Sequence, residues 1–425
     1  MRVFLTIIVV LSLLKISWSQ VITLNDYTLK VIAYNQNLKI AGENVNSADA
    51  AVKSAKTGRL PSLGFDAGFN YQFDPSTVFS TKLKSESWSA NLAVIQPVYN
   101  GLALSNQTEI ARLRSSIASL SKDATMEEVV YSSWILYWDA SANQEYSELS
   151  KEYFSLVKQL YDVVRIRFED GLISRTDLLQ LETRLAEAEL QVSRNDMAYR
   201  IALQRLNAFM GEKSDNPIAV NEINSPLDIA LTPLTDSVEL GRPAYRIAMG
   251  NTEVAGYQTR LAKSQFLPSL AVGLQETWGT GFLNFDNSTS FNTVAFAQLN
   301  IPVFAWNNRK HTLAQSRVAE NISELEVQKL RDQLNLELTN ATTSLSQSAA
   351  QLEISLRNLE TASENLELIV LSYNEGRLPI LDVLSSQLSW LQAYTNLVSS
   401  HLSNKVAMAD YLKASGVFGI TTNEN

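Results

Sequence analysis

The stretch from Leu63 to Phe73 alternates strictly between apolar residues and small or polar ones. Its odd positions are apolar and mostly aromatic, and its even positions are glycine or polar (Leu63, Phe65, Ala67, Phe69, Tyr71 and Phe73 against Gly64, Asp66, Gly68, Asn70 and Gln72). A period of two predicts a β-strand whose two faces meet different surroundings. The residues after Glu86 alternate in the same way, so the pattern predicts a β-hairpin at about residues 61–98.

A second hairpin is predicted at about residues 268–304. Its strands also carry apolar residues at alternate positions, although Glu276 interrupts the first strand (Leu270, Val272, Leu274 and Trp278, then Phe291, Ala295, Ala297, Leu299 and Ile301). Strands of about ten residues with aromatic side chains toward one end are typical of outer-membrane barrels, but the signal of each single strand is weak. The alternative is a soluble sheet that packs on helices.

Helical periodicity occupies most of the remaining chain. It predicts six helices, three on each side of the middle (Leu24–Lys56, Leu102–Phe168 and Asp177–Met210, then Pro243–Lys263, Arg309–Tyr373 and Asp382–Ala414). With a rise of 1.5 Å per residue, the longest reach roughly 100 Å and the others roughly 50 Å or less. Two short helices placed end to end would therefore match one long helix.

The predicted helix from Asp177 carries a coiled-coil seam. Steps of three and four residues connect positions that are apolar with one exception, Asn195 (Leu178, Leu181, Leu185, Ala188, Val192, Asn195, Tyr199, Ala202, Leu206 and Phe209). Such a seam packs lengthwise against another helix. The last helix has an additional stripe, which indicates neighbours on two sides, as in a closed ring of helices (Leu384, Leu388, Leu391, Val398 and Leu402). An ordinary helical bundle would give the same pattern.

Four sequence landmarks recur in the same order in the two halves of the chain. "GRLPSLG" from Gly58 returns as "SQFLPSLA" from Ser264, and "VIQPVYNG" from Val94 returns as "LNIPVFAWNNRK" from Leu299. "RFEDGLISRTDLL" from Arg167 returns as "SYNEGRLPILDVL" from Ser372, and "LNAFMGE" from Leu206 as "DYLKASG" from Asp410. The chain is therefore predicted to be a tandem duplication. One copy spans residues 20–210, a linker spans 211–237, and the second copy with a C-terminal tail spans 238–425.

The third landmark describes a tight turn between two helices. Gly171 and Gly376 supply the positive φ that ends one helix and permits a sharp reversal. Asp177 and Asp382 stand where the next helix begins, and aspartate is a favoured N-cap residue. Asp177 with Gln180 also resembles a capping box.

Composition narrows the chemistry. Cysteine is absent, which excludes disulfides, thiolate metal sites and a cysteine-linked lipid anchor. The only histidines are His311 and His401, and the net charge of −9 argues against a nucleic-acid partner. No P-loop, H-E-x-x-H or G-x-S-x-G motif occurs. The sequence therefore predicts no enzymatic activity and no cofactor.

The N-terminus predicts export. Arg2 precedes an apolar run from Val3 to Leu14, and the small residues Ser17 and Ser19 fit cleavage before Gln20, so residues 1–19 are predicted to be a signal peptide. No later window has the roughly 20 apolar residues that a transmembrane helix needs. If the chain spans a membrane, it does so with strands.

Four strands are too few to close a membrane barrel alone. Lipid offers no hydrogen-bond partner to open sheet edges, so the sheet must close, and the smallest closed membrane barrels have about eight strands. Several chains must therefore share one barrel. Two chains would supply eight strands and three would supply twelve, and this argument does not choose between them.

The hairpins with "LPSL", "QPVYNG" and "IPVFAWNNR", the turn "YNEGRLPILDVL" and the helix start "GRPAYRIA" resemble the TolC-type outer-membrane efflux family across the mature chain. The resemblance implies an α+β membrane protein that forms a homotrimer. Each chain would add four strands to a shared 12-stranded barrel in outer-membrane lipid, and long coiled-coil helices would form an α-barrel in the periplasm. The linker and the C-terminal tail would form an equatorial band.

The same resemblance implies the exit duct of a tripartite efflux or type I secretion system. The passive channel would open when it docks to a periplasmic adaptor and an inner-membrane pump, either proton-driven or ATP-driven. The repeated turns would then form the inner mouth, where Asp177 and Asp382 favour cations and Arg175 and Arg377 bridge neighbouring tips to close it. The alternative function is a periplasmic or surface coiled-coil scaffold that forms no channel.

Overall fold

The computed structural model describes residues 20–78, 81–224, 241–280 and 285–417. The predicted signal peptide, about half of the predicted linker and the end of the C-terminal tail lie outside these ranges. The described chain divides into two compact units. One contains residues up to 40, 123–242 and 332 onward, and the other contains 41–122 and 243–331. None of the helices in the described ranges is long and apolar enough to cross a bilayer.

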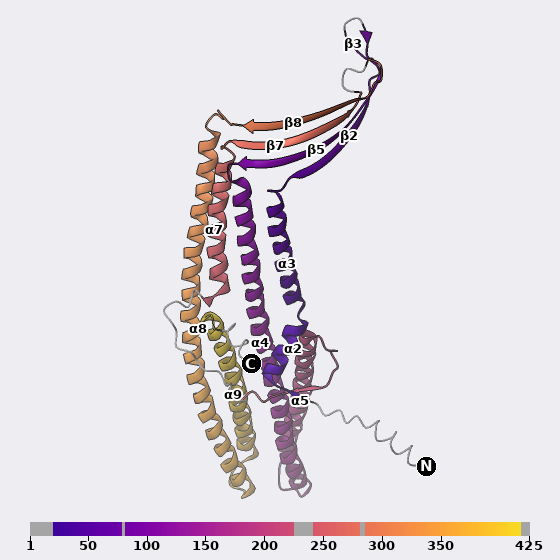
Figure 1. Cartoon of the computed structure of the whole chain (residues 1–425). Coiled ribbons are helices and arrows are strands. Elements are labelled where there is room, and N and C mark those ends of the chain that lie inside the picture. Colours follow the sequence, from indigo (N-terminus) through magenta and orange to yellow (C-terminus); the bar gives the residue numbers. More distant parts are fainter. Residues whose placement is uncertain (1–19, 79–80, 225–240, 281–284, 418–425) are drawn as a thin grey trace, which may run out of the picture. The chain divides into compact units, whose positions relative to one another are not determined.

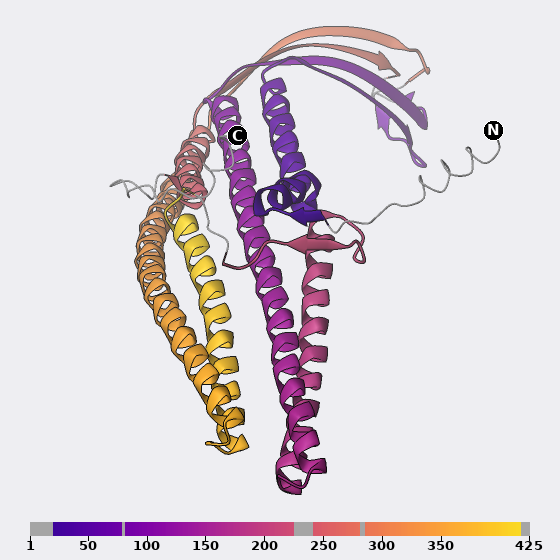
Figure 2. The same ribbon diagram turned by 90° about the horizontal axis from the view of Figure 1, so that it is seen from below.

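The second unit contains one four-stranded antiparallel sheet. Its strands are β2 (Ser62–Tyr71), β5 (Glu86–Asn100), β7 (Ser269–Gly279) and β8 (Ser290–Asn300), in the spatial order β2-β5-β7-β8 (Figure 1). Both predicted hairpins lie in this sheet, because β5 pairs with β7 at their junction. The sheet is strongly curved along its strands (Figure 2). A separate short pair, β3 (Thr77–Val78) and β4 (Thr81–Lys82), lies in the loop between β2 and β5.

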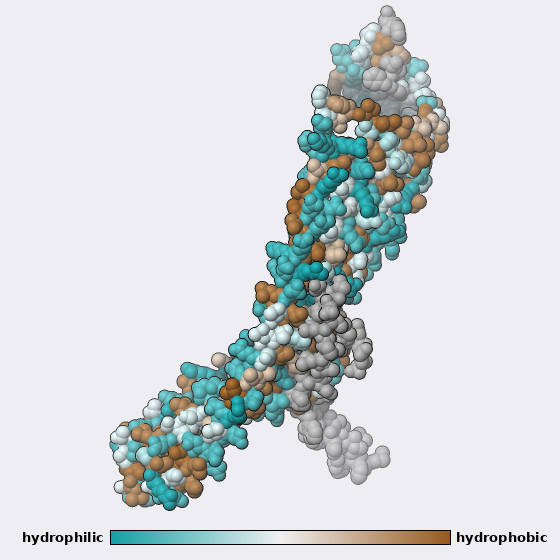
Figure 3. Space-filling view, turned by 90° about the vertical axis from the view of Figure 1, so that its left-hand side faces the viewer, coloured by the Kyte–Doolittle hydropathy of each residue, from teal (hydrophilic) through white to brown (hydrophobic). Residues whose placement is uncertain are grey.

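The two faces of the sheet differ as the alternation predicts. On one face Asn91 donates to Asp66 at 2.8 Å and Thr277 donates to Asn91 at 2.8 Å, which makes a polar row across three strands. On the other face Phe65 stands opposite Leu92, and 65% of its surface is exposed. Figure 3 shows hydrophobic side chains at the surface of this unit. Within one chain the apolar face therefore stays uncovered.

Glu276 lies on the apolar face, as its position in the alternation predicts. The hydroxyl of Thr293, its cross-strand neighbour on β8, donates to the Glu276 carboxylate. The carboxylate thus has a partner within the sheet, which lowers the cost of holding it among apolar side chains. β2 and β8 are the edges of the sheet, with no further strand of the described residues beside either of them.

Five of the six predicted helices form within three residues of their predicted bounds. They are α4 (Ala103–Glu169), α5 (Arg175–Met210), α7 (Pro243–Ser264), α8 (Asn308–Asn374) and α9 (Ile380–Ala414). Figure 1 shows α5 beside α4 and α9 beside α8. The predicted seam of α5 is confirmed, because all ten of its positions are at least partly buried.

The prediction of one helix over Leu24–Lys56 is wrong. The structure has two helices there, α2 (Leu24–Tyr34) and α3 (Gln36–Thr57), which meet at Asn35. The Asn35 side chain accepts from the backbone N–H groups of Asn37 at 2.9 Å and of Leu38 at 3.3 Å. Because asparagine can cap a new helix in this way, it interrupts a stretch whose apolar pattern continues.

Hydrogen bonds of Tyr137 in the first unit connect the start of the described chain to α4, and we call this contact with Ile22 and Asn221 the clasp. Strand β1 (Gln20–Ile22) pairs in parallel with β6 (Ile218–Val220). The buried Tyr137 hydroxyl donates to the Ile22 carbonyl at 2.8 Å and accepts from the Asn221 N–H at 3.0 Å. Tyr137 and Trp138 belong to the largest hydrophobic cluster of this unit.

We predict that Tyr137→Phe lowers the free energy of unfolding by about 1–3 kcal/mol, because the variant loses both hydrogen bonds and leaves buried backbone groups without them. Urea titration of the detergent-solubilised protein, followed by helical circular dichroism, measures the change. Tyr27→Phe is the matched control, since the Tyr27 hydroxyl is buried in the same cluster and has no hydrogen-bond partner. An equal loss in the two variants would contradict the role of the clasp.

Candidate functional site

The two repeated turns share one backbone geometry. Gly171 has φ +74° and Gly376 has φ +76°. In the first turn the N–H of Gly171 bonds the Phe168 carbonyl at 2.9 Å, and the N–H of Leu172 bonds the Arg167 carbonyl at 2.8 Å. The second turn repeats both bonds between equivalent residues, at 3.0 Å and 2.9 Å. This is a Schellman motif in each case, and it ends α4 and α8 in the same way.

Glycine is needed in these turns for its backbone conformation. A β-carbon added to Gly171 or Gly376 would meet no atom within 4 Å, so space does not select the residue. The left-handed φ does, because it places the β-carbon of any other residue in a strained position. The predicted role of both glycines as helix-turn residues therefore rests on φ alone.

The predicted N-caps are wrong in both turns. α5 is capped by Ser174, whose hydroxyl accepts from the Asp177 N–H at 3.2 Å and donates to the Asp177 carboxylate at 2.9 Å. Asp177 is thus the third helical residue, and its two hydrogen bonds with the Ser174 hydroxyl resemble a capping box with Ser174 instead of Gln180. α9 follows Pro379, which offers no side-chain cap, and Asp382 again holds the third position.

A small hydrophobic cluster joins the two turns of one chain. Its buried members are Val164 from α4, Leu181 from α5 and four residues of α8 and α9 (Tyr373, Ile380, Val383 and Leu384). Arg167 adds a polar contact, with its guanidinium carbon 4.9 Å from the centroid of the Tyr373 ring. This geometry is a cation–π contact between α4 and α8, and such contacts contribute about 0.5–1 kcal/mol at exposed sites.

The predicted gate residues lie at these turns but form no Asp–Arg pair within the described chain. Arg377 instead pairs with Glu375 at 3.0 Å, and both side chains are exposed. Arg175 is exposed, while Asp177 and Asp382 are half-buried. Sequence reasoning missed Arg167 and Tyr373. The signal available was their position within one turn before each glycine, but nothing in the sequence shows that the two repeats touch.

A buried charge cluster lies away from the turns, in the same unit. Arg242, 7% exposed, binds the Glu337 carboxylate of α8 at 3.3–3.4 Å. Glu127 of α4, 8% exposed, has one carboxylate oxygen without a hydrogen-bond partner. Burial raises the pKa of Glu127 above its ordinary value, and the charges of Arg242 and Lys413 oppose this only in part. The cluster joins helices of both repeats.

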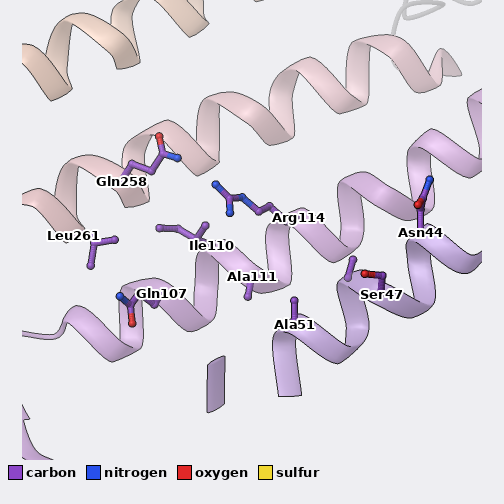
Figure 4. Close-up of a pocket in the computed structure, with 10 residues that line it drawn as sticks. Asn44, Ser47, Ala51, Gln107, Ile110, Ala111, Arg114, Gln258 and Leu261 are labelled. Carbon is purple, nitrogen blue, oxygen red and sulfur yellow. The ribbon is translucent and has the colours of Figure 1, made fainter. Parts of the chain in front are cut away.

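A cavity of about 430 Å³ lies between α3, α4 and α7 in the other unit (Figure 4). Asn44 and Ser47 reach it from α3, Gln107 and Arg114 from α4, and Gln258 from α7. The rest of the lining is apolar, so polar and apolar side chains share the cavity surface (Ala48, Ala51, Ile110, Ala111 and Leu261). No group of His, Asp and Glu in the described part of the chain is placed to hold a metal ion.

The sequence model of the outer membrane efflux protein family matches residues 30–212 and again residues 234–416. These two matches cover most of the chain, including both hairpins, both long helices and both turns. The chain belongs to the outer membrane efflux protein family. It is therefore an outer-membrane transport protein of the TolC type, and it extends into the periplasm.

Relatives of this efflux protein span nearly the whole chain. Nodulation protein T of Rhizobium leguminosarum bv. viciae is 22% identical over 91% of this chain and 82% of its own length. The proteases secretion protein PrtF of Dickeya chrysanthemi is 22% identical over 85% and 80%. The fold matches the CmeC outer membrane channel of Campylobacter jejuni with a TM-score of 0.80 and 16% identity, over 93% of this chain and 85% of that one.

For this efflux protein we predict that Glu127→Gln raises stability at neutral pH. The folded-state pKa of Glu127 lies above the ordinary value of 4.5, so the folded chain holds the proton more tightly than the unfolded chain. The contribution of Glu127 to the free energy of unfolding is therefore greatest at low pH, and it declines as the pH rises above 4.5. Thermal melts between pH 4 and 8 measure this decline. The Glu127→Gln variant should lack this decline in stability. An identical pH profile for the variant and the unmodified protein would contradict a raised pKa of Glu127.

Proposed function

We propose that three copies of this protein form the outer-membrane exit duct of a tripartite efflux or type I secretion system. The observation that carries the proposal is the four-stranded sheet with two open edges and an uncovered apolar face. Lipid offers no hydrogen-bond partner to the backbone groups of either edge, so strands of other copies must pair with them. Three copies give a barrel of twelve strands, which leaves room for a lumen, whereas eight strands enclose a filled interior.

The polar row Asp66–Asn91–Thr277 then faces the lumen, and the face with Phe65 and Leu92 meets lipid. The long helices α4 and α8 continue the duct as a twelve-helix tube, with α5 and α9 completing it toward the turns. A tandem duplication explains why each chain supplies two equivalent hairpins and two equivalent helix pairs. The two matches of the family model support this division, with a linker near residues 211–237.

A periplasmic adaptor docks at the turns, and an inner-membrane pump supplies the energy. The turns carry apolar side chains that no other part of the described chain covers. Leu172 is 72% exposed, and Ile166, Leu371 and Leu381 are each more than half exposed. The name of the relative PrtF favours secreted protein as one class of cargo. The scaffold alternative has no comparable support.

The duct should behave as a detergent-soluble oligomer that conducts ions. The protein extracted from outer membranes is run on a denaturing gel without boiling and is then reconstituted in a planar bilayer. We expect a band of three chains that collapses to one on boiling, and discrete conductance steps in the bilayer. A salt-extractable single chain that forms no channel would favour the scaffold and overturn the proposal.

The gate is proposed to lie at the ring of turns, where Asp177 and Asp382 of each copy meet Arg175 and Arg377 of neighbouring tips. Arg377→Ala and Asp382→Ala each remove one member of these contacts, so each should raise single-channel conductance several-fold. Arg184→Ala is the control, because Arg184 pairs with Glu187 on α5 away from the turns. If neither tip variant differs from Arg184→Ala, closure does not depend on these residues.

A further inference from the structure

The chain beyond β8 differs from its counterpart beyond β5. β5 continues through Pro97 to Asn100, and its last residues pair with β7. The matching residues after Asn300 form no strand and are strongly exposed, with Val303 at 90% and Phe304 at 73%. The two stretches, "QPVYN" and "IPVFA", are similar in sequence. The second stretch therefore has strand-forming character but no partner strand within its own chain.

The two hairpins have the same register when their landmarks are aligned. "LPSL" places Ser62 on Ser269, and "QPV" with "IPV" places Ile95 on Asn300. Ser62 stands opposite Ile95 in the first hairpin, and Ser269 stands opposite Asn300 in the second. The agreement holds along the whole hairpin, since Phe65–Leu92 corresponds to Val272–Ala297. The register of a strand pair in one copy therefore predicts the register of the equivalent pair in the other copy.

The junction of the two hairpins shows how one copy follows the next. Ile95 of β5 stands opposite Gly273 of β7, and Asn100 stands opposite Ser269. Between these pairs the register shifts at Pro97 and Tyr99, so Val98 is an extra residue in β5. Such a bulge bends a strand and increases its twist.

Resting on the shared barrel proposed above, we propose that β8 pairs with β2 of a second copy in this same register. Asn300 then lies opposite Asp66 of the partner subunit, and Phe304 lies opposite Leu63 of the partner subunit. Val303 takes the place of the bulge residue. The stretch from Ile301 to Ala305 completes its strand only when the second copy is present.

Side-chain chemistry agrees with this register. Leu299 meets Ala67 of the partner subunit and Ala297 meets Phe69 of the partner subunit, so apolar residues share the lipid-facing side. The Asn300 amide reaches the carboxylate of the partner's Asp66 from the side opposite Asn91, which already donates to that residue within its own chain at 2.8 Å. A shift of one residue would move every apolar side chain of β2 to the polar face.

Cysteine cross-linking tests the register directly, because the chain has no cysteine of its own. Asn300→Cys with Asp66→Cys and Leu299→Cys with Ala67→Cys sample the two alternating kinds of antiparallel pair. After mild oxidation in the outer membrane, boiled samples are run without reductant. Each double variant should give a covalent species of three chains that reductant returns to one.

Two further double variants serve as controls. Asn300→Cys with Asn70→Cys displaces one cysteine by about 13 Å along the strand, beyond the reach of a disulfide, and should cross-link about tenfold less. Asp66→Cys with Asn91→Cys joins neighbours within one chain and should run as a single chain, which checks that oxidation succeeds.

The outcomes separate this register from the shared barrel itself. Unboiled protein that runs as an oligomer, with no cross-link at either in-register pair or with equal cross-linking of the displaced pair, overturns the register and leaves the duct intact. Unboiled protein that runs as a single chain overturns the duct, and the register with it. Cross-linking confined to the two in-register pairs supports the proposal.

Discussion

The open edges of one four-stranded sheet are the constraint on which the rest of this protein depends. β2 and β8 each present backbone N–H and C=O groups that no other strand of the described chain meets. In water such edges are an aggregation hazard, and in lipid each unpaired group costs several kcal/mol. The apolar face of the same sheet is equally uncovered within one chain. The pairing with further copies proposed above would satisfy both edges.

Two polar contacts in the helical part join segments that are far apart in the sequence. The clasp of Tyr137 with Ile22 and Asn221 fixes the start of the first half to the segment that follows α5. The buried Arg242, directly before α7, pairs with the exposed Glu337 of α8 and lies next to Glu127 of α4. A buried charge such as that of Arg242 is costly to leave without its partner, because it would then be desolvated and unpaired.

The helices that follow the two turns differ in their N-terminal capping, although the turns have the same backbone geometry. The first has a serine cap, with hydrogen bonds between Ser174 and Asp177, whereas the second has Pro379 and no side-chain cap. A serine cap contributes about 1 kcal/mol to the helix that it starts. The start of α9 therefore has less local support than the start of α5. Its position depends more on the hydrophobic cluster around Tyr373 and on Arg167 of α4.

The sequence by itself determined the four strands of the larger sheet, five of the helices, the α5 seam and the two turn glycines. These features follow from period, from sterics at positive φ and from local repeats, all of which act between residues close in the chain. The break at Asn35 and the cap at Ser174 are also local. They were missed because an apolar pattern continues through the first, and because aspartate and serine compete for the second.

Tertiary structure alone decided which distant residues meet. The pairing of β5 with β7, the contact of Arg167 with Tyr373 and the burial of Glu127 beside Arg242 each join residues from different halves of the chain. Periodicity shows which face of an element is apolar, but it carries no information about which partner covers that face. Only packing in three dimensions fixes the partner, because burial free energy depends on the amount of apolar area removed from water and hardly at all on which side chain removes it.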